Sequence, residues 1–341
     1  MEKREVVIVG AGPGGLKCAE VLANKGKDVL VLEKNNIIGD KVCAGGLTLK
    51  DLGLGIPDSI IQRKFNKIII HTPLQDTEIE LEEPFLATLD RKDLGKWMAE
   101  KAKKQGAEIR TETLVKEIKN NKIILNDSEI EFKHLIGADG SNSIVRKHLG
   151  LSSKKVLQAF QYITPKKFEA LELFIDPSKY GPAYLWIFPY KNSASIGTGA
   201  DLKSQQILGL KASDVRNNFN KWCKSSIDIK KSKFQAFIIN YDYQGHEFKN
   251  KFLVGDAAGF ASGLSGEGIY FAIKSGEDVA MKILDKEYSC PNIKHILKVK
   301  KIEESIQKSL ELNKTWSELE WELVNLMFKI RWISKEFFMM I

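Results

Sequence analysis

A glycine-rich turn between an apolar strand and a helix, close to the start of the chain, most constrains the fold of this sequence. Residues 6–9 form a short, wholly apolar run, as do residues 29–32, and each run is typical of a strand buried in a parallel sheet. The helix expected between them, over 13–25, ends in a Lys-Gly-Lys sequence, and glycine commonly follows a helix. These segments together predict one βαβ unit, the opening of a Rossmann-like domain.

The turn itself has the spacing of a dinucleotide-binding motif, Gly10-x-Gly12-x-x-Gly15. The first glycine permits the tight turn, the second lets the backbone approach a pyrophosphate, and the third allows close packing of helix and strand. The helix N-terminus offers free N–H groups and a positive dipole to phosphates, and an acidic residue ending the second strand can bind ribose hydroxyls. The residues expected to bind the cofactor here are Gly10, Gly12, Gly14, Gly15, Glu33 and Lys34.

Two further turns distinguish FAD from a nicotinamide dinucleotide. Ala138-Asp139-Gly140 follows a strand in mid-chain, and a Gly-Asp-Ala-Ala-Gly run over 255–259 follows another near the end. A nicotinamide dehydrogenase needs neither turn, whereas an extended FAD must also be held at its ribityl chain and its flavin ring. We expect Asp256 to accept hydrogen bonds from ribityl hydroxyls and Asp139 to brace the domain near the pyrophosphate. The alternative is that both are ordinary turns without a cofactor.

The length of the chain and the change in residue types along it predict an α/β protein of two domains, since 341 residues suit about two domains. Between residues 156 and 241, strand-like runs become rich in aromatic and β-branched residues. We expect a Rossmann-like FAD-binding domain with a parallel sheet over 1–62, 87–152 and 245–290. A smaller substrate domain of α+β type, with an antiparallel sheet, is expected over 63–86 and 153–244, followed by C-terminal helices over 291–341.

The order of the three glycine motifs resembles the FAD-binding fold of aromatic hydroxylases of the p-hydroxybenzoate hydroxylase type. Two further segments resemble the geranylgeranyl reductase branch, and the likeness extends from about residue 6 to about residue 285. The Lys-Val-Cys-Ala-Gly-Gly-Leu run over 41–47 is similar to the family's Cys-x-Gly-Gly segment, and the run over 184–189 to its YxWxFP signature. The chain departs from the family pattern at Gly181 and Gly263, where proline is usual.

The resemblance implies that a cysteine lies beside the flavin, which makes Cys43 the expected catalytic residue, together with Tyr184 and Trp186. The alternative for Cys43 is a small buried apolar residue. An arginine at a helix start contacts the cofactor in relatives; a surface arginine is the alternative for Arg91. The flavin contacts expected on this basis are Cys43, Ala44, Gly45, Arg91, Gly255, Asp256, Gly266, Gly268 and Ile269.

The substrate site implied by the resemblance is aromatic. Tyr184, Trp186 and Phe188 alternate along one expected strand and therefore share one face; a core position is the alternative for all of them. Gly263, in the loop after the Gly-Asp-Ala-Ala-Gly run, completes the expected substrate-binding set.

The reaction implied by the resemblance is saturation of isolated C=C bonds in polyprenyl chains of archaeal-type lipids or prenyl diphosphates. Hydride would come from N5 of the reduced flavin, and an acid would supply the proton. No second GxGxxG motif offers a site for NADPH, so NADPH and a ferredoxin-type donor protein both stay open as electron sources. A monooxygenase, a quinone reductase or electron-transfer module, and an inactive flavin-binding protein stay open as other functions.

Composition limits the partners and the compartment. A net charge of +8 suits nucleic acid, an anionic membrane or a phosphorylated substrate, and it is also typical of a lysine-rich proteome. No nucleic-acid-binding motif accompanies the charge, so no such partner is expected. The four cysteines lack metal-ligand spacing, which predicts no metal and reduced, cytoplasmic thiols. The charged start indicates no secretory signal, and no apolar run has the ~18 residues of a spanning helix.

The C-terminal segment carries an apolar stripe at steps of three and four residues, flanked by lysines and an arginine among several glutamates. Its members are Trp316, Leu319, Leu323, Leu326, Ile330, Ile333 and Phe337. Three interpretations stay open: packing on the second domain, a helix lying peripherally on the inner face of the cell membrane, and a contact with a partner helix.

Overall fold

The computed structural model of the protein describes residues 2–330, apart from the side chains of residues 200, 202 and 205. The chain forms two compact units, each assembled from three segments. Unit 1 consists of Met1–Lys41, Arg91–Val156 and Ile239–Lys301, and unit 2 of Val42–Asp90, Leu157–Ile238 and Ile302–Ile341. These boundaries differ from the expected domains, because residues 42–62 belong to unit 2 and the C-terminal helices are divided between the units.

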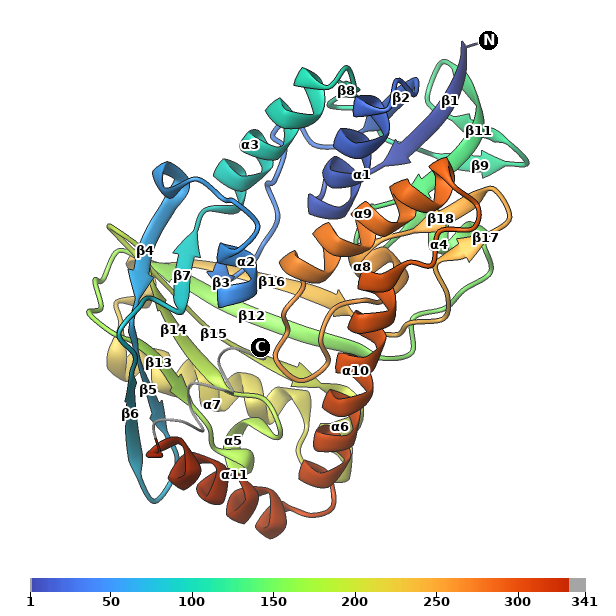
Figure 1. Ribbon diagram of the computed structural model, residues 1–341. Coiled ribbons are helices and arrows are strands. Elements are labelled where there is room, and N and C mark those ends of the chain that lie inside the picture. The colour runs from blue at the N-terminus through green and yellow to red at the C-terminus, as the bar shows by residue number, and fades with distance from the viewer. Residues whose placement is uncertain (1, 331–341) are drawn as a thin grey trace. The chain divides into compact units, whose positions relative to one another are not determined.

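A mainly parallel sheet, in the order β17-β18-β11-β1-β2-β8, forms the centre of unit 1, with β10 and β9 paired beside β11 (Figure 1). Its strands are β1 (Glu2–Val9), β2 (Val29–Leu32), β8 (Glu108–Arg110), β9 (Glu117–Lys119), β10 (Lys122–Ile124), β11 (Glu129–Gly137), β17 (Glu247–Phe248) and β18 (Lys251–Leu253). All neighbours from β18 to β8 pair in parallel, whereas β17, β9 and β10 pair antiparallel. Residues 6–9 and 29–32 are buried, as central parallel strands require.

The helices of unit 1 hold the glycine turn in place. They are α1 (Pro13–Asn24), α3 (Arg91–Lys104), α4 (Ile144–His148), α8 (Gly255–Ala258), α9 (Ile269–Leu284) and most of α10 (Pro291–Leu310). α1 begins with Pro13, whose fixed φ suits the first helical position. It packs tightly on α9, since a Cβ at Gly276 would lie 2.1 Å from the carbonyl oxygen of Gly14. The start of α1 is therefore fixed at the end of β1.

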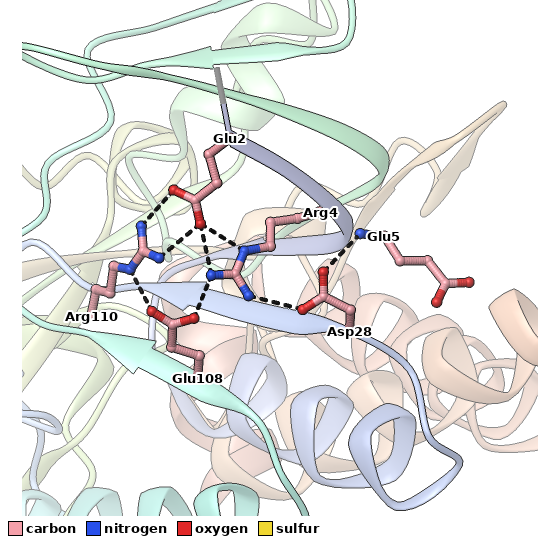
Figure 2. A network of polar contacts seen from close by, with 6 residues as sticks. All are labelled: Glu2, Arg4, Glu5, Asp28, Glu108 and Arg110. Atoms are coloured by element: carbon pink, nitrogen blue, oxygen red, sulfur yellow. Dashed lines mark hydrogen bonds and ion pairs between the residues drawn. The ribbon is translucent and has the colours of Figure 1, made fainter.

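A network of charged residues joins β1, β2 and β8 where these strands begin (Figure 2). The Arg110 guanidinium donates to both carboxylate oxygens of Glu2 at 2.8 Å, and Arg4 donates to Asp28 at 2.9 Å. The Arg110 hydrogen bond lowers the pKa of Glu2 to about 2. The network lies at the opposite end of β1 from the glycine turn, so it stabilises the sheet and takes no part in the chemistry.

A second sheet forms the centre of unit 2, in the order β16-β12-β15-β14-β13-β5-β6 (Figure 1). Its strands are β5 (Lys67–His71), β6 (Asp76–Glu80), β12 (Val156–Thr164), β13 (Leu171–Phe174), β14 (Leu185–Pro189), β15 (Ala194–Asp201) and β16 (Lys233–Asn240). The sheet is mainly antiparallel, as expected, and contains one parallel pair, β13 with β5. The reason is that β5 comes from a distant segment of the chain and joins the free edge of β13.

The remaining elements complete unit 2. A small sheet, β3-β7-β4, consists of β3 (Gly46–Leu47), β4 (Ile61–Phe65) and β7 (Leu86–Leu89). The helices are α2 (Leu49–Leu52), α5 (Pro177–Tyr180), α6 (Leu202–Ile207), α7 (Ala212–Ser226) and α11 (Lys314–Phe328), with 3-10 turns at Asp58–Ile60 and Ile229–Lys231. α7 covers the sheet with Val215, Phe219 and Cys223, which are buried against Phe160 and Ile196.

His71 gives unit 2 a pH-dependent contact. Its ring nitrogens lie 2.8 Å from Asp76 Oδ1 and 3.0 Å from Glu172 Oε2, and its ring stacks on Phe174. The Glu172 hydrogen bond, with Asp76, raises the pKa of His71 above its ordinary value despite partial burial. A raised pKa means that this stabilisation is fully present below the unfolded pKa of about 6.5 and is lost as pH rises through the folded value.

We therefore expect His71→Gln to destabilise the protein by on the order of 1 kcal/mol at about pH 6 and by less at about pH 8. Thermal unfolding across this range measures the difference from wild type. The exposed His295→Gln serves as the control and should follow the wild-type profile. A His71→Gln deficit that does not change with pH would contradict the assignment.

Candidate functional site

The glycine turn of unit 1 is closed by backbone contacts that only glycine allows. Gly10 has φ +100, and a Cβ there would lie 2.5 Å from the carbonyl oxygen of Ala138. A Cβ at Gly15 would lie 2.4 Å from the carbonyl oxygen of Gly10. Gly12 is the N-cap of α1, and no side chain of residues 2–330 caps this helix. The first-turn N–H groups are therefore left for a phosphate group.

Glu33 lies against this turn with little exposure. One carboxylate oxygen accepts a hydrogen bond from the Ala11 amide and the other from the Asn35 amide, both at 2.9 Å. The neighbouring Lys34 is exposed. The carboxylate is thus held at the end of β2, beside the turn, which is the position a ribose-binding acid requires.

Asp139 braces the turn from the adjacent strand. Its carboxylate accepts from the Ile144 amide at 2.6 Å, at the start of α4. Burial raises the pKa of Asp139 above its ordinary range, and hydrogen bonds from Ser143 and from the Ile144 amide oppose this shift. Because the Ala138–Asp139 backbone abuts Gly10, the side chain acts as an anchor for the turn.

Asp256, at the start of α8, forms an ion pair that the sequence did not predict. The ammonium group of Lys41 lies 2.7 Å from Asp256 Oδ2, and the lysine side chain is 44% exposed. Such a solvent-screened pair is weak, so it can give way to a hydroxyl donor. Gly268 lies beside this carboxylate, because a Cβ at Gly268 would be 3.4 Å from Asp256 Oδ1. Glycine places no side chain against the carboxylate at this point.

The loop before α9 contains two of the expected flavin contacts, Gly266 and Gly268. α9 begins at Ile269, with Gly268 as its N-cap. Gly266 has φ +73, a left-handed conformation that cannot belong to a helix. The loop is instead held by Ser262, whose hydroxyl accepts from the Ser265 amide at 2.9 Å. Gly263 lies in this loop, half-buried, and belongs to unit 1.

Arg91 is the first residue of α3 and is 9% exposed. Its Nε atom is buried and has no hydrogen-bond partner among the described residues. A guanidinium in this state is costly unless an acceptor arrives, and phosphate or ribityl oxygens are suitable acceptors. The open first-turn amides of α1 and the unpartnered Nε of Arg91 together fit an FAD.

Replacing Arg91 by methionine will weaken FAD binding by about tenfold, because a charge-assisted hydrogen bond is lost. The melting temperature of the apoprotein should stay unchanged or rise, since the substitution removes a buried Nε that has no hydrogen-bond partner among the described residues. FAD titration and apoprotein unfolding measure the two effects. Arg63→Met, which removes a hydrogen bond to the Phe168 carbonyl in unit 2, is the control and should lower only stability. An unchanged FAD affinity for Arg91→Met would remove Arg91 from the site.

In unit 2, three contacts hold the loop that carries Cys43. Tyr190 donates its hydroxyl to the Ala44 carbonyl at 2.7 Å, and Gln161 donates to the Cys43 carbonyl at 3.2 Å. Gly45 has φ +67, and a Cβ there would lie 2.2 Å from the carbonyl oxygen of Leu89. The thiol is half-buried and accepts a hydrogen bond from the Gly45 amide at 3.3 Å. The other cysteines are fully buried, so Cys43 differs from a packing residue.

A chain of polar side chains lies behind this loop. Trp186 donates its indole N–H to the Ser195 hydroxyl at 2.9 Å, and Ser195 donates to Gln161 at 3.0 Å. Gln161 also donates to Gln235 at 2.8 Å. Sequence reasoning missed Tyr190, Ser195 and both glutamines. The only local signal is the polar character of Gln161 and Ser195 inside otherwise apolar strands.

The three aromatic residues of the 184–189 run lie in a row on one side of β14. The ring centroids of Tyr184 and Trp186 are 6.3 Å apart, and those of Trp186 and Phe188 are 6.2 Å apart. Trp186 is buried, and a Cβ at Gly197 would meet its ring at 2.3 Å. Tyr184 and Phe188 are only partly buried against the core. The row therefore has one buried member, Trp186, and two partly exposed members, Tyr184 and Phe188.

Comparison with known proteins agrees with a flavoprotein fold. A model of the FAD binding domain matches residues 3–170. A geranylgeranyl bacteriochlorophyll reductase-like protein of Thermoplasma acidophilum has the same fold, with a TM-score of 0.76 and 23% identity over 92% of this chain and 88% of its own. The chain is thus an FAD-binding flavoprotein.

Relatives found by sequence indicate which family of FAD-binding flavoproteins the chain belongs to. An uncharacterised protein of Methanosarcina barkeri is 32% identical over 81% of this chain and 73% of its own. The geranylgeranyl diphosphate reductase of Rhodobacter capsulatus is 27% identical over 82% and 74%. The digeranylgeranylglycerophospholipid reductase of Methanosarcina acetivorans is 29% identical over 80% and 73%. The chain belongs to the geranylgeranyl reductase family of FAD-dependent oxidoreductases.

Proposed function

We propose that this protein saturates C=C bonds in the polyprenyl chains of a lipid or a prenyl diphosphate. The observation that carries the proposal is the half-buried Cys43 thiol, fixed on a loop by Tyr190 and Gln161. The aromatic row continues this arrangement, because a Cβ at Gly46 would meet the Phe188 ring at 2.6 Å. The names of two relatives, which are reductases of a prenyl diphosphate and of a prenyl phospholipid, support the same substrate class.

An isolated C=C bond accepts a hydride only if its other carbon is protonated at the same time or before. Bound FAD, once reduced, supplies the hydride at N5. We assign the proton to the Cys43 thiol, whose Sγ accepts the Gly45 amide N–H. That hydrogen bond stabilises the thiolate left after proton transfer, and water then restores the thiol. One hydride and one proton add across each bond, so the reaction balances.

The aromatic row suits both the substrate and the charge that develops on it. Each CH₂ of a prenyl chain that leaves water contributes about 0.8 kcal/mol, so partly exposed Tyr184 and Phe188 favour an apolar chain. Aromatic faces also attract the positive charge that develops at the tertiary carbon. Trp186 acts as a positioning residue, because its N–H links the row to the Ser195–Gln161 chain behind Cys43.

An anaerobic single-turnover assay tests the proposal. The purified protein, loaded with FAD and reduced with dithionite, is mixed with geranylgeranyl diphosphate or with a geranylgeranyl glycerol ether lipid. We expect flavin reoxidation without oxygen and a product that has gained two hydrogens per reduced bond. Reoxidation only in air, stimulated by an aromatic compound, would indicate a monooxygenase; rapid reoxidation by quinone alone would indicate a quinone reductase. Dithionite removes any dependence on NADPH or a ferredoxin-type donor.

A further inference from the structure

Helix α11 presents an apolar surface to solvent. Its members lie three or four residues apart along the helix and its C-terminal end, and each is between 45% and 59% exposed: Trp316, Leu319, Leu323, Leu326, Met327 and Ile330. Leu312, just before the helix, is 68% exposed. We call this set the α11 face. A helix on the surface of a soluble protein normally turns its polar residues outward, and α11 does the opposite here.

The orientation of α11 is fixed by contacts on its other side. Glu322 accepts hydrogen bonds from the Thr72 hydroxyl at 2.9 Å and the Leu74 amide at 3.0 Å, and Asn325 donates to Thr72 at 3.0 Å. Phe328 is buried in the core of unit 2 beside β5 and β6. Figure 1 shows α11 at the bottom of the view, close to α5 and β6. The described members of the stripe seen in the sequence, from Trp316 to Ile330, therefore face away from the core of unit 2, and Ile333 and Phe337 lie outside the described residues.

Basic residues flank the α11 face. Lys314 and Lys329 are exposed at its two ends. Two glutamates of the helix are engaged by hydrogen bonds within unit 2: Glu322 binds the Thr72 loop, and Glu320, beside Trp316, accepts from the Ser309 hydroxyl at 2.9 Å. Lysines beside an apolar stripe that carries a tryptophan match a helix lying in the interface of an anionic bilayer.

We propose that the α11 face docks the protein onto an anionic lipid surface. None of the helices that the structure describes is both long and apolar enough to cross a bilayer. The contact proposed here is a peripheral one. A second copy is a poorer occupant. Two-fold pairing of α11 would place Lys314 and Lys329 close to the same lysines of the other copy.

The composition of the sequence after the described residues also suits an anionic lipid surface. Residues 331–341 include Trp332, Ile333 and a Phe-Phe-Met-Met-Ile end, with Arg331 and Lys335 among them. The proposal concerns binding and does not depend on the reductase activity, so its failure would leave that activity untouched.

Co-sedimentation of the full-length protein with vesicles tests the proposal. Vesicles of phosphatidylglycerol mixed with phosphatidylcholine are compared with phosphatidylcholine alone. We expect the wild type to bind the anionic vesicles and the double variant Leu323→Glu, Leu326→Glu to bind at least about tenfold more weakly. Lys314→Glu with Lys329→Glu should lose the preference for anionic vesicles while keeping residual binding to the neutral ones.

The matched control is Leu114→Glu, which adds a charge at an exposed leucine of unit 1 and should bind vesicles as the wild type does. All altered positions are exposed, so melting temperatures near the wild-type value confirm folding. Equal binding by wild type and the Leu323/Leu326 variant would overturn the proposal. Light scattering that shows a wild-type dimer, dissociated by that variant and indifferent to vesicles, would overturn it in favour of a second copy.

Discussion

Gly10→Ala will retain FAD at least about 100-fold less well than the wild type. The φ of +100 at this position strains any residue with a Cβ, and the added atom would lie 2.5 Å from the Ala138 carbonyl oxygen. Backbone on both sides of the turn must move to relieve the contact, and the same backbone forms the start of the phosphate-binding helix. FAD titration monitored by flavin fluorescence measures the affinity.

Gly26→Ala is the control that separates the effect of backbone strain from the effect of the steric clash at Gly10. Gly26 follows α1 with φ +75, but a Cβ there would meet nothing within 4 Å. This variant should lose about 1 kcal/mol of stability and keep its FAD affinity. If both glycine variants bound FAD as the wild type does, the turn of unit 1 would not be the cofactor site.

Cys43→Ala will lower alkene reduction by at least about 100-fold and leave FAD bound, since loss of a general acid typically costs 10²–10⁴-fold. The loop should persist in the variant, because Tyr190 and Gln161 bind backbone carbonyls and do not need the thiol. Product formation under single-turnover conditions and FAD titration give the two readouts.

Two further variants sharpen this result. Cys43→Ser keeps a hydrogen-bond acceptor for the Gly45 amide but has a much weaker acid, so it should be nearly as slow as the alanine variant. Cys223→Ala, in the α7 core, should lower stability and leave turnover per folded molecule unchanged. Wild-type turnover in Cys43→Ala would show that another group delivers the proton.

Local patterns in the sequence predicted the elements near the cofactor well. β2 has the predicted bounds, and α1 matches its prediction to within a residue. These elements depend on apolar spacing and on glycine or proline at their ends, and both can be read within a short window. The FAD-binding fold is confirmed by the matching domain model and the common fold.

Features that depend on contacts between residues far apart in the sequence were not predicted. β15 was missed because Gly197 and Gly199 lower its strand propensity, yet Gly197 leaves the space that the Trp186 ring fills. The link from Gln161 to the Cys43 carbonyl joins residues 118 positions apart. The outward orientation of the α11 face is likewise decided by Glu322 and Asn325 meeting Thr72, which no helical period reveals.

Lipid mass spectrometry in cells tests the central claim most directly. A host that makes unsaturated archaeal-type lipids would express the wild type, Cys43→Ala or neither, with protein levels matched. We predict that only the wild type shifts the lipids upward by two hydrogens for each saturated C=C bond. Identical lipid masses in all three cultures, with the wild type loaded with FAD and supplied with a working electron donor, would contradict a polyprenyl reductase.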